Sequence, residues 1–176
     1  MDAASILYWE EGISMKELSV KKLSMTGLMA ALICVLTMFP RIPIPAGAGY
    51  IHLGDGMILL AAMLLGPMAI PAAAIGSALA DLFSGYALYA PATCLIKGLV
   101  ALIAYLLYRK GHILQTLIAF VAAEVAMVAG YFIFEWFIAR EYAVVDIVGN
   151  TIQGASGVAL GVAFTYAVPR LEKSLK

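Results

Sequence analysis

Long runs of apolar residues constrain this chain more than any other feature of its sequence. Of the 176 residues, 64% are hydrophobic and 12% are charged, whereas a soluble domain usually carries about 25% charged residues. Several runs approach or exceed the ~20 residues that a helix needs to cross the hydrocarbon core of a bilayer, and Pro, Gly or single charges separate them. The sequence therefore predicts an all-α protein, a bundle of transmembrane helices.

The most economical division of the sequence gives six spans, at about 24–39, 56–66, 68–86, 91–109, 113–139 and 146–168. The second span is short and ends at a Gly-Pro pair, so spans two and three could also form one bent re-entrant unit, because proline interrupts a helix. With six spans and a cytoplasmic N-terminus, eight basic residues lie inside and only Arg41 and Arg140 lie outside, in agreement with the positive-inside rule. We therefore expect six spans with both termini in the cytoplasm.

One membrane domain accounts for most of the chain. We expect it to cover residues 24–170, with residues 1–23 as a cytoplasmic or interfacial extension and residues 171–176 as a cytoplasmic tail. The extension carries acidic residues before the first apolar run, which is the wrong charge order for a cleaved signal peptide. No length is left for a soluble catalytic domain.

The sequence lacks the short motifs of several enzyme classes. It has no GxxxxGK[ST] phosphate-binding loop, no HExxH, no GxSxG and only two histidines, so the chain is not expected to hydrolyse ATP or to be an enzyme. Its formal net charge of +0 gives no basic stripe for nucleic acid. Both cysteines lie inside apolar runs and are expected to be packing residues. We expect no cofactor, no metal and no nucleic-acid partner.

The segment between the first two spans, residues 40–55, is irregular and yet apolar. It contains three prolines and three glycines, which exclude a regular helix. Irregular backbone at membrane depth survives only where protein or a cavity satisfies it, so this outer loop is expected to fold over a ligand cavity. Tyr50 and His52 are candidate ligand contacts at its end. His52 and Asp55 could cap the following helix or help close the site, and capping is the default interpretation for Asp55.

Polar residues inside the spans indicate where a ligand binds, because an ionisable group at mid-membrane costs at least ~2.5 kcal/mol unless it faces a partner or water. Most of them lie in the outer half, as in a cup open to the outside. One face of span five carries Glu124, Met127 or Val128, Tyr131 and Glu135, and Asn150 and Gln153 lie one turn apart on span six. These groups suit a small polar heterocycle. Hydrogen bonding between helices is the alternative interpretation.

Two opposite charges lie at similar depth on sequential spans, Asp81 and Lys97. We expect them to form a buried structural ion pair, since either charge alone would be far more costly. In the alternative interpretation, Lys97 contacts the substrate.

Small residues four positions apart permit close approach between helices. Such pairs occur on span one (Gly27 and Ala31), on span three (Gly76 and Ala80) and on span six (Gly157 and Gly161). Packing within the chain is the default interpretation for all three. The pair on span one would also suit docking of another subunit.

The order of several segments resembles the substrate-binding S components of energy-coupling factor (ECF) vitamin transporters. These segments are TGLMAAL, YIHLGDGMILLAAMLLGP, SALADLFSGY, PATCLIKGL, AEVAMVAGYFIFE and GNTIQGASGVALG. The resemblance covers residues 16–170. It implies a subunit of the bacterial cytoplasmic membrane that captures a vitamin from outside and docks on a transmembrane T component driven by two ATPase subunits, which use the ATP.

The resemblance also assigns roles to residues. The AxxxA docking motif of the family's first helix matches Gly27 and Ala31, with Gly in place of the first Ala. The family's ligand site maps onto the loop near Tyr50–Asp55 and onto spans four to six, at Lys97, 124–131 and 150–153. Asp81 and Lys97 lie in segments shared by members with different vitamins, which favours a scaffold role for both.

The candidate pocket residues hold more acid than base, which favours a neutral or weakly cationic nitrogen heterocycle. Pyridoxine, pyridoxamine or hydroxymethylpyrimidine is the expected substrate. The anion pantothenate is second, with Lys97 as its only basic partner within the spans. A stand-alone small-molecule permease and a structural membrane subunit are the alternatives outside the ECF class.

Overall fold

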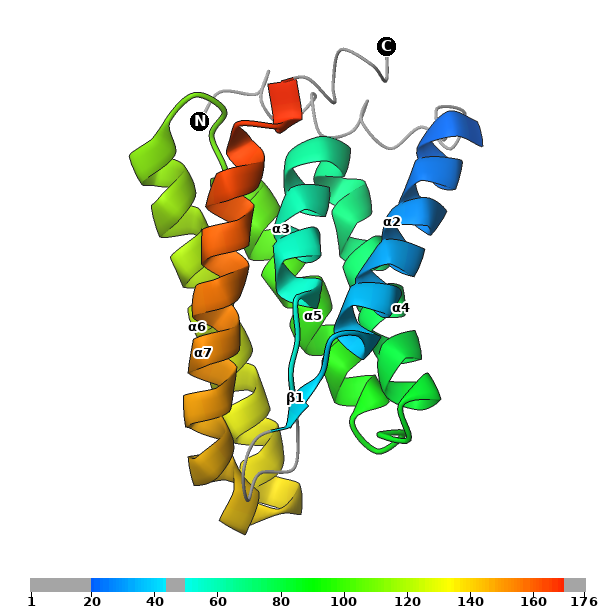
Figure 1. Cartoon of the computed structure of the whole chain (residues 1–176), viewed down its shortest axis with the longest axis vertical. Coiled ribbons are helices and arrows are strands. Elements are labelled where there is room, and N and C mark those ends of the chain that lie inside the picture. Colours follow the sequence, from blue (N-terminus) through cyan, green and yellow to red (C-terminus); the bar gives the residue numbers. More distant parts are fainter. Residues whose placement is uncertain (1–19, 44–49, 170–176) are drawn as a thin grey trace, which may run out of the picture.

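The computed structural model describes residues 20–43 and 50–169, which form a bundle of helices with two short strands (Figure 1). The described elements are α2 (Val20–Met38), β1 (Ile42–Pro43), β2 (Tyr50–Ile51), α3 (Gly54–Leu65), the 3-10 helix η2 (Gly66–Met68), α4 (Ala69–Phe83), α5 (Ala90–Leu107), α6 (Ile113–Ile138) and α7 (Arg140–Thr165). The predicted tail and most of the predicted extension lie outside the described residues. The predicted helical membrane bundle is confirmed.

The helices α2 to α7 run alternately up and down the bundle (Figure 1), so that the start of α2 and the end of α7 lie at the same end. Five described segments are long and apolar enough to cross a membrane, and one of them, Gly54–Phe83, combines α3, η2 and α4. With 12 residues, α3 is only about 18 Å long, against about 30 Å for the hydrocarbon core. Six full spans and cytoplasmic termini therefore stay predictions.

The chain reverses direction at Gly66, whose φ of 58° is in the left-handed region that favours glycine. Pro67 follows, and α4 begins at Ala69. The sequence placed this break correctly. The start of the last helix was placed too late, at 146, because α7 follows α6 after Ala139 alone and its first turns are polar.

Small residues bring the helices into close contact. A Cβ added at Gly76 of α4 would lie 2.4 Å from the Ala30 carbonyl oxygen of α2, and one at Gly161 of α7 would lie 2.8 Å from Leu59 of α3. Packing within the chain therefore accounts for the small pairs on α4 and α7. It does not account for the pair on α2, where a Cβ added at Gly27 would meet nothing within 4 Å.

The outer loop contributes two strands that the sequence did not predict. They pair antiparallel, with Ile42 opposite Ile51 and Pro43 opposite Tyr50. Arg41 anchors the first strand, because its guanidinium lies 4.7 Å from the centre of the Tyr50 ring and donates a hydrogen bond to the Ser84 hydroxyl. Because Arg41 contacts both Tyr50 of β2 and Ser84, β2 lies close to the turn that follows α4. Residues 44–49, the middle of the predicted lid, lie outside the described residues.

Candidate functional site

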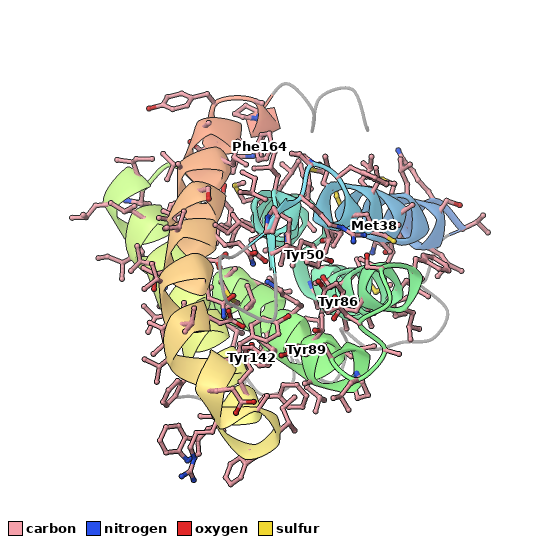
Figure 2. All side chains as sticks on the ribbon, turned by 60° about the horizontal axis from the view of Figure 1, so that its bottom comes forward. Met38, Tyr50, Tyr86, Tyr89, Tyr142 and Phe164 are labelled. Carbon is pink, nitrogen blue, oxygen red and sulfur yellow. The ribbon has the colours of Figure 1, made fainter. Side chains whose placement is uncertain are left out.

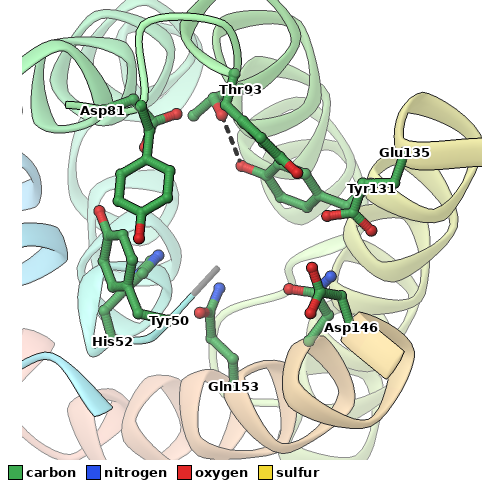
Figure 3. Close-up of a pocket in the computed structure, with 11 residues that line it drawn as sticks. Tyr50, His52, Asp81, Thr93, Tyr131, Glu135, Asp146 and Gln153 are labelled. Carbon is green, nitrogen blue, oxygen red and sulfur yellow. Dashed lines mark hydrogen bonds between the residues drawn. The ribbon is translucent and has the colours of Figure 1, made fainter. Parts of the chain in front are cut away.

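A pocket lies toward the end of the bundle at which the strands pair, and α4, α5, α6, α7 and the segment around β2 contribute to it (Figure 3). The cavity itself measures about 50 Å³, and about 450 Å³ when the open space at its mouth is included. Its lining consists of polar or aromatic side chains, namely Tyr50, His52, Asp81, Tyr86, Tyr89, Thr93, Tyr131, Glu135, Asp146, Asn150 and Gln153. The view from this end shows Tyr50, Tyr86 and Tyr89 near the centre of the bundle (Figure 2).

Aromatic rings follow one another from the loop to α6. The ring centres are 5.6 Å apart for His52 and Tyr50, 5.3 Å for Tyr50 and Tyr86, 6.2 Å for Tyr86 and Tyr89, and 5.3 Å for Tyr89 and Phe134. These separations lie within the range of favourable aromatic pairs. The pocket therefore has a wall of aromatic rings that a planar ligand can stack against.

Three carboxyl groups line the pocket, those of Asp81, Glu135 and Asp146, whereas no lysine or arginine of the described chain does. Burial, followed by the charges of Glu135 and Asp146, raises the pKa of the Tyr89 phenol. A cleft with carboxyl groups of one sign and apolar walls concentrates a negative potential. The described lining therefore offers carboxyl oxygens to a ligand and no lysine or arginine side chain.

A buried polar network joins three helices next to the pocket. Lys97 Nζ of α5 lies 2.5 Å from Asp55 Oδ1 at the start of α3, and the side chains are 1% and 0% exposed. The Gln153 amide nitrogen of α7 donates to Asp55 Oδ2 at 2.7 Å. The charge of Lys97 is therefore neutralised inside the protein.

Two sequence predictions about these charges are wrong. The partner of Lys97 is Asp55 and not Asp81, because Asp81 lines the pocket while the Lys97 side chain reaches α3. Asp55 caps no helix, since α3 has no side-chain capping bond and the carboxylate is engaged by Lys97 and Gln153. Depth along a helix axis does not define the direction of a side chain.

The hydrogen bonds of the network determine which polar groups of Gln153 and Tyr131 remain available to a ligand in the pocket. Because the Gln153 amide nitrogen donates to Asp55, its carbonyl oxygen is the part left to accept a hydrogen bond from a ligand. Tyr131 shares a 3.0 Å hydrogen bond with the Thr93 hydroxyl, and its ring centre lies 5.4 Å from Lys97 Nζ. The Tyr131 ring thus contacts the network as well as lining the pocket.

His52 is neutral at physiological pH. Burial is the main cause that lowers the pKa of His52 to about 4, with smaller contributions from Lys97 and Arg41 and an opposing one from Asp55. Its Nδ1 accepts a hydrogen bond from the backbone N–H of Gly54 at 3.1 Å, so the proton of the neutral ring is on Nε2. Hence His52 adds no positive charge to the pocket.

Comparison with known proteins decides the family. A model of the family described as "ECF-type riboflavin transporter, S component" matches residues 17–170. The chain belongs to this family. The resemblance inferred from the sequence is confirmed, and this S component is accordingly a multi-pass protein of the cytoplasmic membrane that serves vitamin uptake.

Two further proteins are similar to this chain. An uncharacterized protein in a "gap 3'region" of Pyrococcus woesei is 35% identical over 142 residues, which cover 78% of this chain and 95% of that protein. The crystal structure of the S-component for biotin from an ECF-type ABC transporter matches with a TM-score of 0.65 and 20% identity, over 91% of this chain and 95% of that one. At 20% identity, the similarity to the biotin S-component shows a shared fold.

The structure gathers some of the predicted ligand residues of this S component and separates others. Those that line the pocket are Tyr50, His52, Tyr131, Asn150 and Gln153. Lys97 is bound in the network, Met127 is fully buried in the core, and Glu124 packs against α7. A Cβ added at Gly157 of α7 would lie 3.2 Å from Glu124 Oε1. Glu124 instead lines a groove between α6 and α7.

Sequence reasoning missed several pocket residues. Asp146 was overlooked because it lay at the assumed start of the sixth span. Tyr86 and Tyr89 lie in the turn between α4 and α5, where the segment GYALYAP places two aromatic rings three positions apart. Two tyrosines at that spacing in an outer turn could have indicated a ligand-contacting wall, because tyrosine combines an apolar ring with a polar hydroxyl group.

Proposed function

We propose that this S component captures a small, uncharged or positively charged nitrogen heterocycle from outside the membrane, with pyridoxine, pyridoxamine or hydroxymethylpyrimidine as the substrate. The observation that carries the proposal is the composition of the pocket. Four tyrosines and three carboxyl groups line it, and no lysine or arginine of the described residues does. A one-ring heterocycle stacks on the tyrosines and donates its N–H and O–H groups to the carboxyl and carbonyl oxygens.

The polar groups of the pocket give the ligand an orientation. The Gln153 carbonyl oxygen accepts from a hydroxyl or amine of the substrate, and the Asn150 amide, which lines the pocket from the same helix, both donates and accepts. Tyr86 and Tyr89 contact the ring face. These contacts leave the carboxyl groups of Glu135 and Asp146 for the most basic atom of the ligand.

Other vitamins are supported less well by the pocket. Pantothenate carries a carboxylate, and its charge would meet three carboxyl groups while Lys97 is already paired with Asp55. Riboflavin is the second candidate because the family description names it. Its three fused rings and ribityl chain would occupy far more of the pocket than a single ring.

We also propose that release of the vitamin requires docking on a T component with two ATPase subunits, with the strand end of the bundle outside and both chain termini in the cytoplasm. Gly27 and Ala31 of α2 are exposed and four residues apart, and the space around Gly27 is open. Such a face accepts a helix of another subunit at close range. A family in which S components operate with these partners supports the proposal.

Binding and mass spectrometry test the substrate. The purified protein is analysed for a co-purifying small molecule and then titrated with pyridoxine, pyridoxamine, hydroxymethylpyrimidine, riboflavin and pantothenate. Asn150→Ala should weaken binding by about 1–3 kcal/mol, the cost of an unpaired buried polar group. Thr151→Ala is the matched control, because Thr151 is the adjacent residue of α7 and lines the groove with Glu124 instead. Retention of pantothenate alone would refute the proposed substrate class.

A further inference from the structure

Two side chains of the pocket are each held so that they present one kind of hydrogen-bonding group to a ligand. His52 follows β2 and Gln153 lies on α7, and both line the pocket (Figure 3). They are buried, with 8% and 3% of their surface exposed. Their orientations are determined by hydrogen bonds with the first two residues of α3, Gly54 and Asp55. Because adjacent residues hold both side chains, the two groups lie at the same edge of the pocket.

The backbone of α3 fixes the tautomer of His52. The N–H of Gly54 lies 3.1 Å from His52 Nδ1. A backbone N–H only donates, so Nδ1 must accept, and the proton of the neutral imidazole is on Nε2. The other tautomer would place two N–H groups against each other. The polar group that His52 can offer to a ligand is therefore the donor Nε2–H.

The Asp55 carboxylate fixes Gln153 in the opposite sense. The 2.5 Å ion pair with Lys97 keeps Asp55 ionised, and an ionised carboxylate only accepts hydrogen bonds. The Gln153 amide must therefore turn its NH₂ group to Asp55 Oδ2, which lies 2.7 Å away. Inversion of the amide would place its carbonyl oxygen against the carboxylate. The group of Gln153 that is left for a ligand is the acceptor, its carbonyl oxygen.

A donor and an acceptor at one edge of a pocket match a ligand edge that carries an acceptor and a donor. We propose that His52 Nε2–H and the Gln153 carbonyl oxygen form a recognition pair for a ring nitrogen next to an amino group. The inference rests on the proposed function and narrows it to hydroxymethylpyrimidine, whose amino group is on the carbon next to a ring nitrogen. In pyridoxine and pyridoxamine, the carbons next to the ring nitrogen carry only a methyl group and a hydrogen.

An analogue that differs in one group tests the pair on the wild-type protein. In this analogue a methyl group replaces the amino group of hydroxymethylpyrimidine, so the shape is kept and the donor is lost. Titration of the purified protein should show at least about tenfold weaker binding of the methyl analogue, because the Gln153 carbonyl oxygen is left unpaired. Pyridoxine and pyridoxamine should also bind at least about tenfold more weakly than hydroxymethylpyrimidine. This comparison needs no variant and so does not depend on how a variant folds.

Two variants assign the contacts. Gln153→Met removes the carbonyl oxygen, so it should weaken binding of hydroxymethylpyrimidine at least about tenfold and should not weaken binding of the methyl analogue. His52→Phe keeps a ring next to Tyr50, 5.6 Å away in the wild type, and removes the donor. It should weaken binding of both ligands by a similar factor of at least about tenfold, since both retain the ring nitrogen.

His112→Phe is the matched control for His52→Phe. His112 is exposed and lies just before α6, outside the pocket lining. This substitution should leave the Kd of every ligand unchanged. A thermal melt without ligand checks that each variant is folded.

The outcomes separate the inference from the proposed function. Equal binding of hydroxymethylpyrimidine and its methyl analogue by the wild type, or equal losses for both ligands in folded Gln153→Met, would overturn the recognition pair alone. Tighter binding of pyridoxine or pyridoxamine than of hydroxymethylpyrimidine would also overturn the pair, while the proposed substrate class would stand. Binding of riboflavin or pantothenate alone would refute the proposed class and the inference together.

Discussion

Removal of one partner from the Lys97–Asp55 pair should destabilise this protein more than any other conservative change in the described bundle. Both side chains are fully buried, and the pair joins α5 to α3. Breaking a buried pair typically costs 3–5 kcal/mol, because the remaining charge stays buried without its ion-pair partner. Asp55→Asn should therefore lower the free energy of unfolding by about 3–5 kcal/mol, and Lys97→Met should lower it by a similar amount.

The double variant should be much less damaged than the sum of the two single variants. With Asp55→Asn and Lys97→Met together, no buried charge remains at the site, and the Asn side chain still accepts the hydrogen bond that Gln153 donates. We expect a coupling energy of at least about 2 kcal/mol between positions 55 and 97. Equilibrium unfolding of the ligand-free protein in mixed micelles measures all four free energies.

Asp81→Asn is the matched control for Asp55→Asn, because the sequence predicted Asp81 as the ion-pair partner of Lys97. Asp81 lines the pocket and forms no salt bridge with Lys97, although the two charges interact electrostatically. The coupling between positions 81 and 97 should therefore be much smaller than that between positions 55 and 97. Additive effects at positions 55 and 97, combined with a large coupling between 81 and 97, would refute the assignment of the pair.

Three further predictions follow from buried or exposed positions. The folded-state pKa of His52 is about 4 and the unfolded value is 6.5, so the unfolded chain binds more protons between these pH values. Wild-type stability should therefore fall by about 3 kcal/mol as the pH drops from 6.5 to 4. His52→Gln should remove that dependence in thermal melts. Gly27→Leu should abolish uptake and leave vitamin binding unchanged. Gly76→Leu should prevent folding, because a side chain there collides with Ala30. Uptake assays and binding titrations on both variants distinguish the two outcomes. Glu124→Gln should leave vitamin affinity unchanged in titrations, since Glu124 is absent from the pocket lining and its buried carboxyl group packs against α7; weakened binding would return it to the site.

The sequence alone predicted those features of the structure that depend on residues close together in the chain. Apolar runs and the Gly66-Pro67 break predicted the helices to within a few residues at most boundaries, because hydropathy and proline act over short distances. Asn150 and Gln153 were placed in the pocket by their spacing on one helix, and the structure has both in its lining. Helical periodicity alone establishes which residues share a face.

The same reasoning failed where a contact depends on how helices are rotated against one another. Glu124 and Tyr131 lie on one face of α6, yet only Tyr131 lines the pocket while Glu124 packs on the glycines of α7. The two residues are seven positions apart and thus about 10 Å apart along the axis, which is enough for one to face the pocket and the other a helix interface. No pattern within a single helix contains that information.

The partner of Lys97 decides more than stability, because it determines the charge of the pocket. In the arrangement expected from the sequence, Lys97 would neutralise Asp81 and the pocket would keep the charges of Glu135 and Asp146 alone. In the structure Lys97 neutralises Asp55, which does not line the pocket, and none of the described lysines or arginines lines the pocket beside its carboxyl groups. An anionic vitamin gains nothing from a lysine that is already paired. One change of partner in the buried network thus removes the only basic group within the spans that could have met a carboxylate in the pocket.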